Sequence, residues 1–346
     1  MSGRTEGGAK GRRPARFRFA AIVLAAACLF IPTFAVAAPP ERMEVSAHPI
    51  KQFHIGHDET RFGPLSFVGG LEMTSNAGDF GGLSAFRFRK PGSDFIGVAD
   101  TGFWFFGRIE HDADERPSGV SNFTMQAMVD ADGNIIGRKW LTDAEGLGIR
   151  GDIATVGFER HHRVSEFRID PADMKAPIRD LDFLVPRKEL RMNRGFETVV
   201  YAPEDGPLKG ARIVVSEKSL DENGDQFAAI LEGPQKGVFT VRRSGKFDIT
   251  DGAFLPNGDL LLLERSFSYA DGVAMQLRRI DGKTIGRGKL ADGPVLLQAD
   301  MSYQIDNMEG LDVWRRSDGA LMVSIISDDN QSLLQRNLYL EFRLDE

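Results

Sequence analysis

The sequence predicts an all-β fold, a β-propeller built from four-stranded blades. Three observations lead to this prediction. Pairs of short apolar runs joined by a turn recur five times, beginning near residues 81, 145, 197, 251 and 309. Their spacings of 64, 52, 54 and 58 residues leave room for two more strands in each unit, as a propeller blade requires. Long amphipathic helix patterns are absent from the sequence, so no helical layer competes with this arrangement.

The five paired runs are expected to form antiparallel hairpins. The pair at 251–268 is the plainest, because Asn257-Gly258 between two apolar runs is a strong signal for a tight β-turn. In every pair the turn lies near the midpoint between the flanking polar residues, so both polar ends should lie on the same side. In chain order the paired runs are 81–86 with 95–100, 145–147 with 153–160, 196–200 with 213–218, 251–255 with 260–268, and 309–314 with 321–328.

The segments between the hairpins supply the outer strands. Residues 122–129, 237–242 and 273–280 have strand-like patterns, and 337–344 alternates as a final strand. The segment 64–72 resembles 293–298, which precedes the last hairpin, so we expect the N-terminal segment to close the ring and leave no open sheet edge. Five repeats are visible. A sixth could lie in the long first spacer, so six blades are the alternative to five.

The first 37 residues have the pattern of a secretory signal peptide. A basic stretch at 11–18 precedes an apolar segment at 19–34, and Ala35-Val36-Ala37 matches the small-x-small cleavage pattern. The apolar segment is too short for a membrane span. The pair Arg12-Arg13 leaves both the general secretory and the twin-arginine route open. We therefore expect cleavage after Ala37, a propeller domain at 38–346, and a periplasmic or secreted protein.

Cleavage would change the composition of the chain. It removes Cys28, the only cysteine, so the mature protein would have neither a disulfide nor a reactive thiol. It leaves 37 Lys and Arg against 49 Asp and Glu, a net charge of −12. An acidic chain without a basic tract argues against nucleic acid as a partner, and no later segment has the length and apolarity of a membrane span. We expect a monomer that acts on a small molecule.

The polar ends of the hairpins should gather around one mouth of the central channel. Nine acids and three bases cannot all stay ionised there without further cations. Clustered carboxylates suit Ca²⁺, and less well Mg²⁺. The alternative is purely structural: the acids accept backbone N–H bonds or form ion pairs between blades. The residues concerned are Asp100, Glu145, Glu159, Glu197, Glu217, Asp251, Glu264, Glu309 and Asp328, with Arg160, Lys218 and Arg265.

Other motifs favour structure over chemistry. Residues 221–225 with Glu232 match several positions of a calcium loop, but Gln226 stands where that loop needs glycine, so we expect a hairpin turn. The aromatic run 103–106 is expected to pack between blades. The sequence contains no Gly-x-Ser-x-Gly elbow, His-Glu-x-x-His motif or P-loop, which disfavours serine hydrolases, zinc proteases and nucleotide-binding proteins.

The repeated pattern of Glu-Gly-Leu, turn and β-run, seen at 145–160 and 309–328, resembles the phytase-like domain family, described as having esterase-like activity. The resemblance extends over about 62–342 and implies an exported propeller that hydrolyses esters or phosphoesters. The chain departs from the pattern at Gly81 in the first repeat and at Asp251 in the fourth, where the glutamate is replaced.

Two functions follow as alternatives. In the first, a metal-assisted hydrolase, Ca²⁺ is held at the channel mouth and polarises the substrate, while basic side chains clamp its anionic part. In the second, a non-catalytic propeller recognises a ligand or protein in the periplasm. For the hydrolase, the expected metal ligands are Glu145, Glu197, Asp251 and Glu309, and the expected catalytic residues are Glu159, Glu217, Glu264, Arg160, Lys218 and Arg265.

Overall fold

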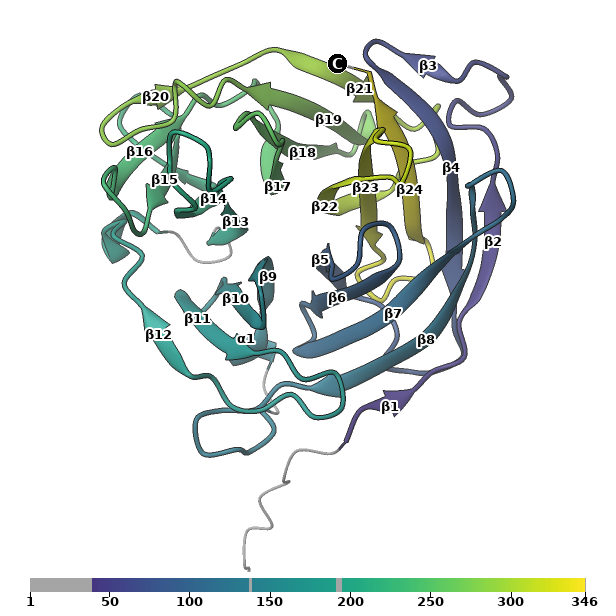
Figure 1. Cartoon of the computed structure of the whole chain (residues 1–346), viewed down its shortest axis with the longest axis horizontal. Helices are drawn as coiled ribbons and strands as arrows, with labels where there is room; N and C mark the ends of the chain where they lie inside the picture. Colours follow the sequence, from purple (N-terminus) through teal and green to yellow (C-terminus); the bar gives the residue numbers. More distant parts are fainter. Residues whose placement is uncertain (1–38, 137–138, 191–194, 346) are drawn as a thin grey trace, which may run out of the picture. The chain divides into compact units, whose positions relative to one another are not determined.

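The computed structural model describes residues 39–136, 139–190 and 195–345, all within the unit Ala35–Glu346. In this unit five antiparallel sheets are arranged around a common axis as the blades of a β-propeller (Figure 1). Among the described residues, helix is limited to α1 (Lys139–Thr142) and the short 3₁₀ helix η1 (Arg187–Glu189). The predicted all-β propeller is confirmed, and of the two blade numbers left open the structure has five.

Each of the five sequence hairpins forms the two inner strands of one blade. The first blade consists of β5 (Leu83–Phe88), β6 (Asp94–Ala99), β7 (Phe103–His111) and β8 (Pro117–Ala127), with β1 (Glu41–Arg42) at its outer edge. The second consists of β9 (Ala144–Arg150), β10 (Ile153–Phe158), β11 (Arg163–Arg168) and β12 (Arg179–Leu181). The third consists of β13 (Phe196–Tyr201), β14 (Arg212–Leu220), β15 (Gln226–Ile230) and β16 (Gly237–Val241), with β20 (Leu290–Ala291) parallel to β16.

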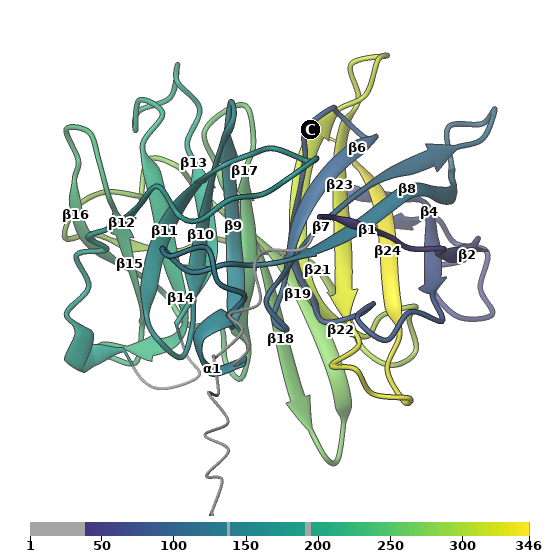
Figure 2. The same ribbon diagram turned by 90° about the horizontal axis from the view of Figure 1, so that it is seen from below.

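The last two blades complete the ring. The fourth consists of β17 (Asp248–Phe254), β18 (Leu260–Ser268), β19 (Gly272–Ile280) and β21 (Val295–Ala299). The fifth consists of β22 (Asn307–Arg315), β23 (Leu321–Asp328), β24 (Asn337–Leu344), β4 (Leu65–Thr74) and β2 (Ser46–Ile50), with β3 (Arg61–Phe62) beside β4. Seen from the side, the hairpin of β18 and β19 extends beyond the other blades at one face (Figure 2).

The N-terminal segment closes the propeller as predicted. Strand β4 pairs with β24 from Asn337 opposite Met73 to Leu344 opposite Leu65. Strand β2 then covers the outer edge of β4. Strands β2 and β4 from the N-terminal part of the chain therefore share the fifth blade with the C-terminal strand β24, which has partners on both sides instead of an open edge.

Apolar side chains fill the spaces between neighbouring blades. Trp104 of the first blade packs in a buried cluster with Val156 and Phe167 of the second, and its ring lies 5.0 Å from that of Phe167. The aromatic run 103–106 thus provides the expected interblade contact. The turn at 221–225 joins β14 to β15, and its first carboxylate accepts two backbone N–H groups of the turn itself, which is the hairpin turn that the sequence favoured over a calcium loop.

Candidate functional site

Every innermost strand carries one β-bulge at the same place. In the pairing of β5 with β6, Leu83 lies opposite Ala99 and Ala85 opposite Val98, so that Ser84 is the extra residue. The same one-residue shift recurs in the other four blades. A bulge re-aims the side chain at its position. The five bulge residues are Ser84, Glu145, Glu197, Thr250 and Glu309.

The second strand of each blade brings a charged residue beside this bulge, at the end of the strand or within it. This residue is an acid in the first, second, third and fifth blades and an arginine in the fourth. The first blade needs a glycine opposite, because a Cβ at Gly82 would lie 2.3 Å from Oδ1 of Asp100. The residues at this position are Asp100, Glu159, Glu217, Arg265 and Asp328.

All of these positions except Ser84 and Thr250 line a pocket of about 220 Å³, which we call the acidic mouth. Eight acids face two arginines in it, so the charge excess that the sequence predicted at a channel mouth is present. The lining residues are Asp100, Asp143, Glu145, Glu159, Glu197, Glu217, Glu309 and Asp328, together with Arg160, Arg265 and Asn330.

The electrostatics of the acidic mouth reflect burial and mutual repulsion. Burial, together with Glu217 and Asp143, raises the pKa of Glu159 to about 8. Burial raises the pKa of Glu309 to about 7, although Arg265 opposes the shift. Burial and neighbouring carboxylates also raise the pKa of Glu145 well above its ordinary value. The same causes act on Glu197 and Asp328, whose pKa values are likewise well above the ordinary range. Without a further cation, these carboxylates favour bound protons near neutral pH.

The two arginines of the pocket lie beside different acids. Arg160 places Nε 2.7 Å from a carboxylate oxygen of Asp143. Arg265 places Nη2 3.3 Å from Glu309 and 3.8 Å from Glu217. Each guanidinium is therefore held by acids of the mouth and borders the cavity, where it can meet an anionic group.

Residues 78–331 match the family model described as "Phytase-like: Esterase-like activity of phytase". The chain belongs to this phytase-like family. A comparison with curated proteins finds no match.

Solved structures similar to the phytase-like propeller include three proteins with low sequence identity. One is the PQQ-bound aldose sugar dehydrogenase of Streptomyces coelicolor, at 9% identity and TM-score 0.40, covering 88% of this chain and 100% of that one. Another is the glutaminyl cyclase of Myxococcus xanthus, at 11% identity and TM-score 0.39, covering 82% and 97%. A third is the endo-arabinase of Bacteroides thetaiotaomicron, at 12% identity and TM-score 0.45, covering 76% and 94%. Similarities at this level say nothing of activity.

Two groups of carboxylates in the phytase-like propeller are close enough to share a cation. In each group three side chains bring one oxygen apiece within 4.8 Å of one another. Hard oxygen donors at such spacing suit Ca²⁺. The first group is Asp100, Asp143 and Glu145, and the second is Glu159, Glu197 and Glu217.

Asp143 was missed by the sequence reasoning. It lies one residue before β9, outside the apolar run that defined the hairpin, and its backbone C=O accepts the N–H of Glu159. The only sequence signal for it is its spacing of two residues from Glu145, which places both carboxylates beside the same bulge.

Two of the expected site residues lie elsewhere, and this corrects the sequence prediction for them. Asp251 is fully buried and is held by Arg87, with Nη1 to Oδ2 at 2.7 Å and Nη2 to Oδ1 at 2.8 Å. Glu264 is also fully buried and accepts hydrogen bonds from Gln276 and Arg278. Strand register is the physical reason: Thr250 is the bulge residue and Arg265 lies beside it, so Asp251 and Glu264 are each one residue away from the positions that acids occupy in most other blades.

Lys218 is a third correction. Its Nζ lies 2.5 Å from Oδ2 of Asp248, whose other oxygen accepts a hydrogen bond from Arg243. Lys218 does not line the acidic mouth. In the first repeat, the residue that corresponds to Glu145 of the second repeat is Ser84 and not Gly81, because Ser84 is the bulge residue.

Proposed function

We propose that the acidic mouth is the site of a calcium-dependent hydrolase that acts on phosphoesters or carboxylic esters. The observation that carries the proposal is the charge imbalance of one small pocket, in which eight mostly buried acids meet two arginines. Membership of a family described by esterase-like activity supports the same reaction class.

The residues of the mouth fit a divalent cation. Glu159, Glu197 and Glu217 offer three oxygens within 4.8 Å of one another, and burial and mutual repulsion raise the pKa values of Glu159 and Glu197. A cation among them would replace the protons that these carboxylates otherwise favour. A second cation would be held by Asp100, Asp143 and Glu145, although Asp143 already forms an ion pair with Arg160. Glu309 is the weaker candidate ligand, because Asn307 and Arg265 hold it.

The cation and the residues of the mouth would have different roles in the reaction. When bound, calcium would polarise the ester or phosphoryl oxygen and lower the pKa of a water ligand. Arg265 and Arg160 would orient the anionic part of the substrate, because guanidinium N–H groups bind carboxylate and phosphate oxygens. Glu159 would then act as a ligand and not as a proton carrier, because the bound cation takes the place of its proton.

The size of the mouth limits what it can enclose. A volume of about 220 Å³ is smaller than ordinary pockets for drug-sized ligands. The site would therefore enclose the head group that reacts, while the remainder of the substrate stays outside the ring.

Calcium binding and ester turnover test the proposal. Calorimetric titration with Ca²⁺ should show binding to the wild type, and Glu197→Gln should weaken it at least about tenfold, because it removes one charged ligand. Glu44→Gln, on an exposed residue far along the chain from the mouth, serves as the charge-matched control. Turnover of p-nitrophenyl phosphate and p-nitrophenyl acetate should require Ca²⁺ and stop with chelator.

A non-catalytic binding propeller is the alternative outcome. If the purified protein binds no divalent ion, and chelator changes neither the melting temperature nor the turnover of either ester, the hydrolase proposal is wrong.

We also propose that the protein is exported as a monomer after cleavage following Ala37. The leader 1–37 lies outside the described residues. Within the described part of the chain, no helix is long and apolar enough to cross a membrane. The intact mass of the secreted protein should correspond to a chain beginning at Ala38, and a mass that retains Cys28 would contradict this.

A further inference from the structure

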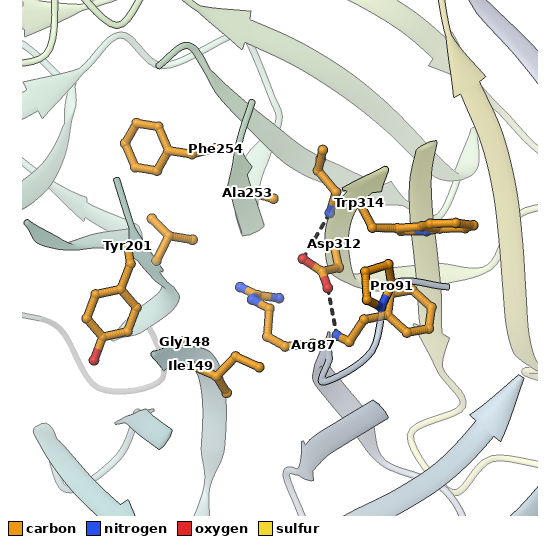
Figure 3. Close-up of a pocket in the computed structure, with 12 residues that line it drawn as sticks. Arg87, Pro91, Gly148, Ile149, Tyr201, Ala253, Phe254, Asp312 and Trp314 are labelled. Atoms are coloured by element: carbon orange, nitrogen blue, oxygen red, sulfur yellow. Dashed lines mark hydrogen bonds between the residues drawn. The ribbon is translucent and has the colours of Figure 1, made fainter. Parts of the chain in front are cut away.

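A second pocket, separate from the acidic mouth, is formed by the same five inner strands. It has a volume of about 310 Å³ and shares none of its lining residues with the acidic mouth (Figure 3). Each blade contributes the residue three positions after its bulge, and we call this pocket the far pocket. These residues are Arg87, Gly148, Val200, Ala253 and Asp312.

Arg87 is fully engaged by the protein. Besides its two bonds to Asp251, its guanidinium donates to the backbone carbonyls of Leu311 at 2.7 Å and Gly252 at 3.2 Å. The charges of Arg87 and Asp251 cancel within one buried pair. Both Nη atoms of Arg87 are therefore occupied by the protein, and Arg87 together with Asp251 offers no net positive charge to an anion.

Asp312 is the carboxylate of the far pocket that forms no close ion pair within the described part of the chain. Its Oδ2 accepts the N–H of Phe88 at 2.7 Å, and its Oδ1 accepts the N–H of Val313 at 2.9 Å (Figure 3). No basic nitrogen of the described residues lies within 4.0 Å of its carboxylate, and Arg87, which is already paired with Asp251, attracts it from farther away. The side chain is only partly buried, and each oxygen keeps a lone pair for a further donor. Burial raises the pKa of Asp312 to about 6.

The walls of the far pocket are apolar and aromatic. Phe254, Val200 and Trp314 line the space, and Gly148 and Ala253 add little side-chain volume to it. Trp314 is fixed by a hydrogen bond from its Nε1 to Ser324.

Tyr201 contributes less apolar surface, because two guanidinium groups already lie over its ring. The Cζ atoms of Arg150 and Arg212 lie 4.5 and 5.0 Å from the ring centroid. Arg150 is in turn paired with Glu232 at 3.1 Å. The polar end of the far pocket is therefore Asp312, and its open apolar surface lies at Phe254 and Trp314.

We propose that the far pocket binds a small organic cation, a primary or quaternary ammonium group on a short hydrocarbon body. The ammonium group would lie against Asp312, which supplies the negative charge, and the hydrocarbon would pack on the apolar lining of the pocket, such as Phe254. An anion is disfavoured because Arg87 is neutralised. The proposal does not depend on the hydrolase site.

Direct binding tests the proposal. Titrations of n-butylammonium and tetramethylammonium should show binding to the full chain, and 1-butanol, which matches n-butylammonium without its charge, should bind at least about tenfold more weakly. Asp312→Asn should lower the affinity for n-butylammonium at least about tenfold, because it removes the charge while keeping the shape. Phe254→Ala should lower it several-fold through lost aromatic contact.

Matched variants separate this site from other acids. Asp318→Asn, on the exposed turn of the same blade, should leave the affinity unchanged. Glu197→Gln, in the acidic mouth, should leave it unchanged as well. The proposal is overturned if no ammonium ion binds the wild type up to about 100 mM, if 1-butanol binds as tightly, or if binding survives Asp312→Asn.

Discussion

Replacing Arg87 with methionine should destabilise the propeller more than most single substitutions. The side chain is 6% exposed, and that of its partner Asp251 is 0% exposed. Arg87 also donates to carbonyls of the third, fourth and fifth blades, at Val199, Gly252 and Leu311. One arginine thus donates hydrogen bonds to a backbone carbonyl of the innermost strand in each of three other blades. Methionine would fill a similar volume while leaving a buried carboxylate and several carbonyls without donors.

The magnitude follows from these contacts. Removing one partner of a buried ion pair costs about 3–5 kcal/mol, and the orphaned carbonyls add to this cost. At about 2 °C per kcal/mol for a domain of this size, Arg87→Met should lower the melting temperature by about 6–10 °C. Urea unfolding followed by tryptophan fluorescence and calorimetric melting both measure the change.

A double variant checks the assignment of the cost to the buried charge. Arg87→Met combined with Asp251→Asn removes both charges and keeps an amide oxygen to accept the N–H of Leu311, as the carboxylate does at 2.8 Å. The double variant should be more stable than Arg87→Met alone by at least about 1 kcal/mol. The reasoning fails if Arg87→Met melts at the wild-type temperature, or if Asp251→Asn lowers the stability of the Arg87→Met variant further.

Three further predictions concern stability. The pKa of Glu159 is raised to about 8, so the stability linked to it is complete below its unfolded value and is lost as the pH rises through about 8. In chelator the melting temperature should therefore fall as the pH is raised over this range, and the increase in melting temperature on adding Ca²⁺ should be largest at the alkaline end. A melting temperature that does not change with pH would contradict this. Gly97→Ala should cost about 1–3 kcal/mol in urea unfolding, because its Cβ would lie 2.0 Å from Cζ of Phe105, whereas at Gly119, the control, the nearest atom is 4.0 Å away. Deleting 62–71 removes most of β4 between β24 and β2, so the chain should lose its β-sheet circular dichroism, and a folded deletion variant would disprove the closure.

The fold could be predicted from the sequence because its signals are local and repeated. Two apolar runs and a turn predict each hairpin, as at Asn257-Gly258, where Gly258 adopts a φ of 92°. Five such units can bury their apolar faces only against one another, which leads to a ring. The closing role of 64–72 could also be predicted, because the final strand 337–344 needs a partner. The number of blades was left open, since a spacer of irregular length does not reveal how many strands it contains.

The gathering of acids at one mouth was likewise a consequence of the sequence pattern. A hairpin with polar residues at both open ends must place them together, as at Glu145 with Glu159 and at Glu197 with Glu217. The sequence could not show that Asp143 joins them, because its place depends on the chain segment before β9.

Only the tertiary structure decided which residue of the fourth blade faces the acidic mouth. The sequence places Asp251 and Glu264 at the ends of that hairpin, but the bulge at Thr250 adds one residue to one strand alone. Since side chains alternate between the two faces of a strand, a shift of one residue exchanges the inward and outward sets. Arg265 therefore reaches the acidic mouth, Glu264 turns to Arg278, and Asp251 meets Arg87 at a separation of 164 residues in the chain. Bulges and contacts at that separation leave no local mark in a sequence, because they are fixed by how neighbouring blades pack.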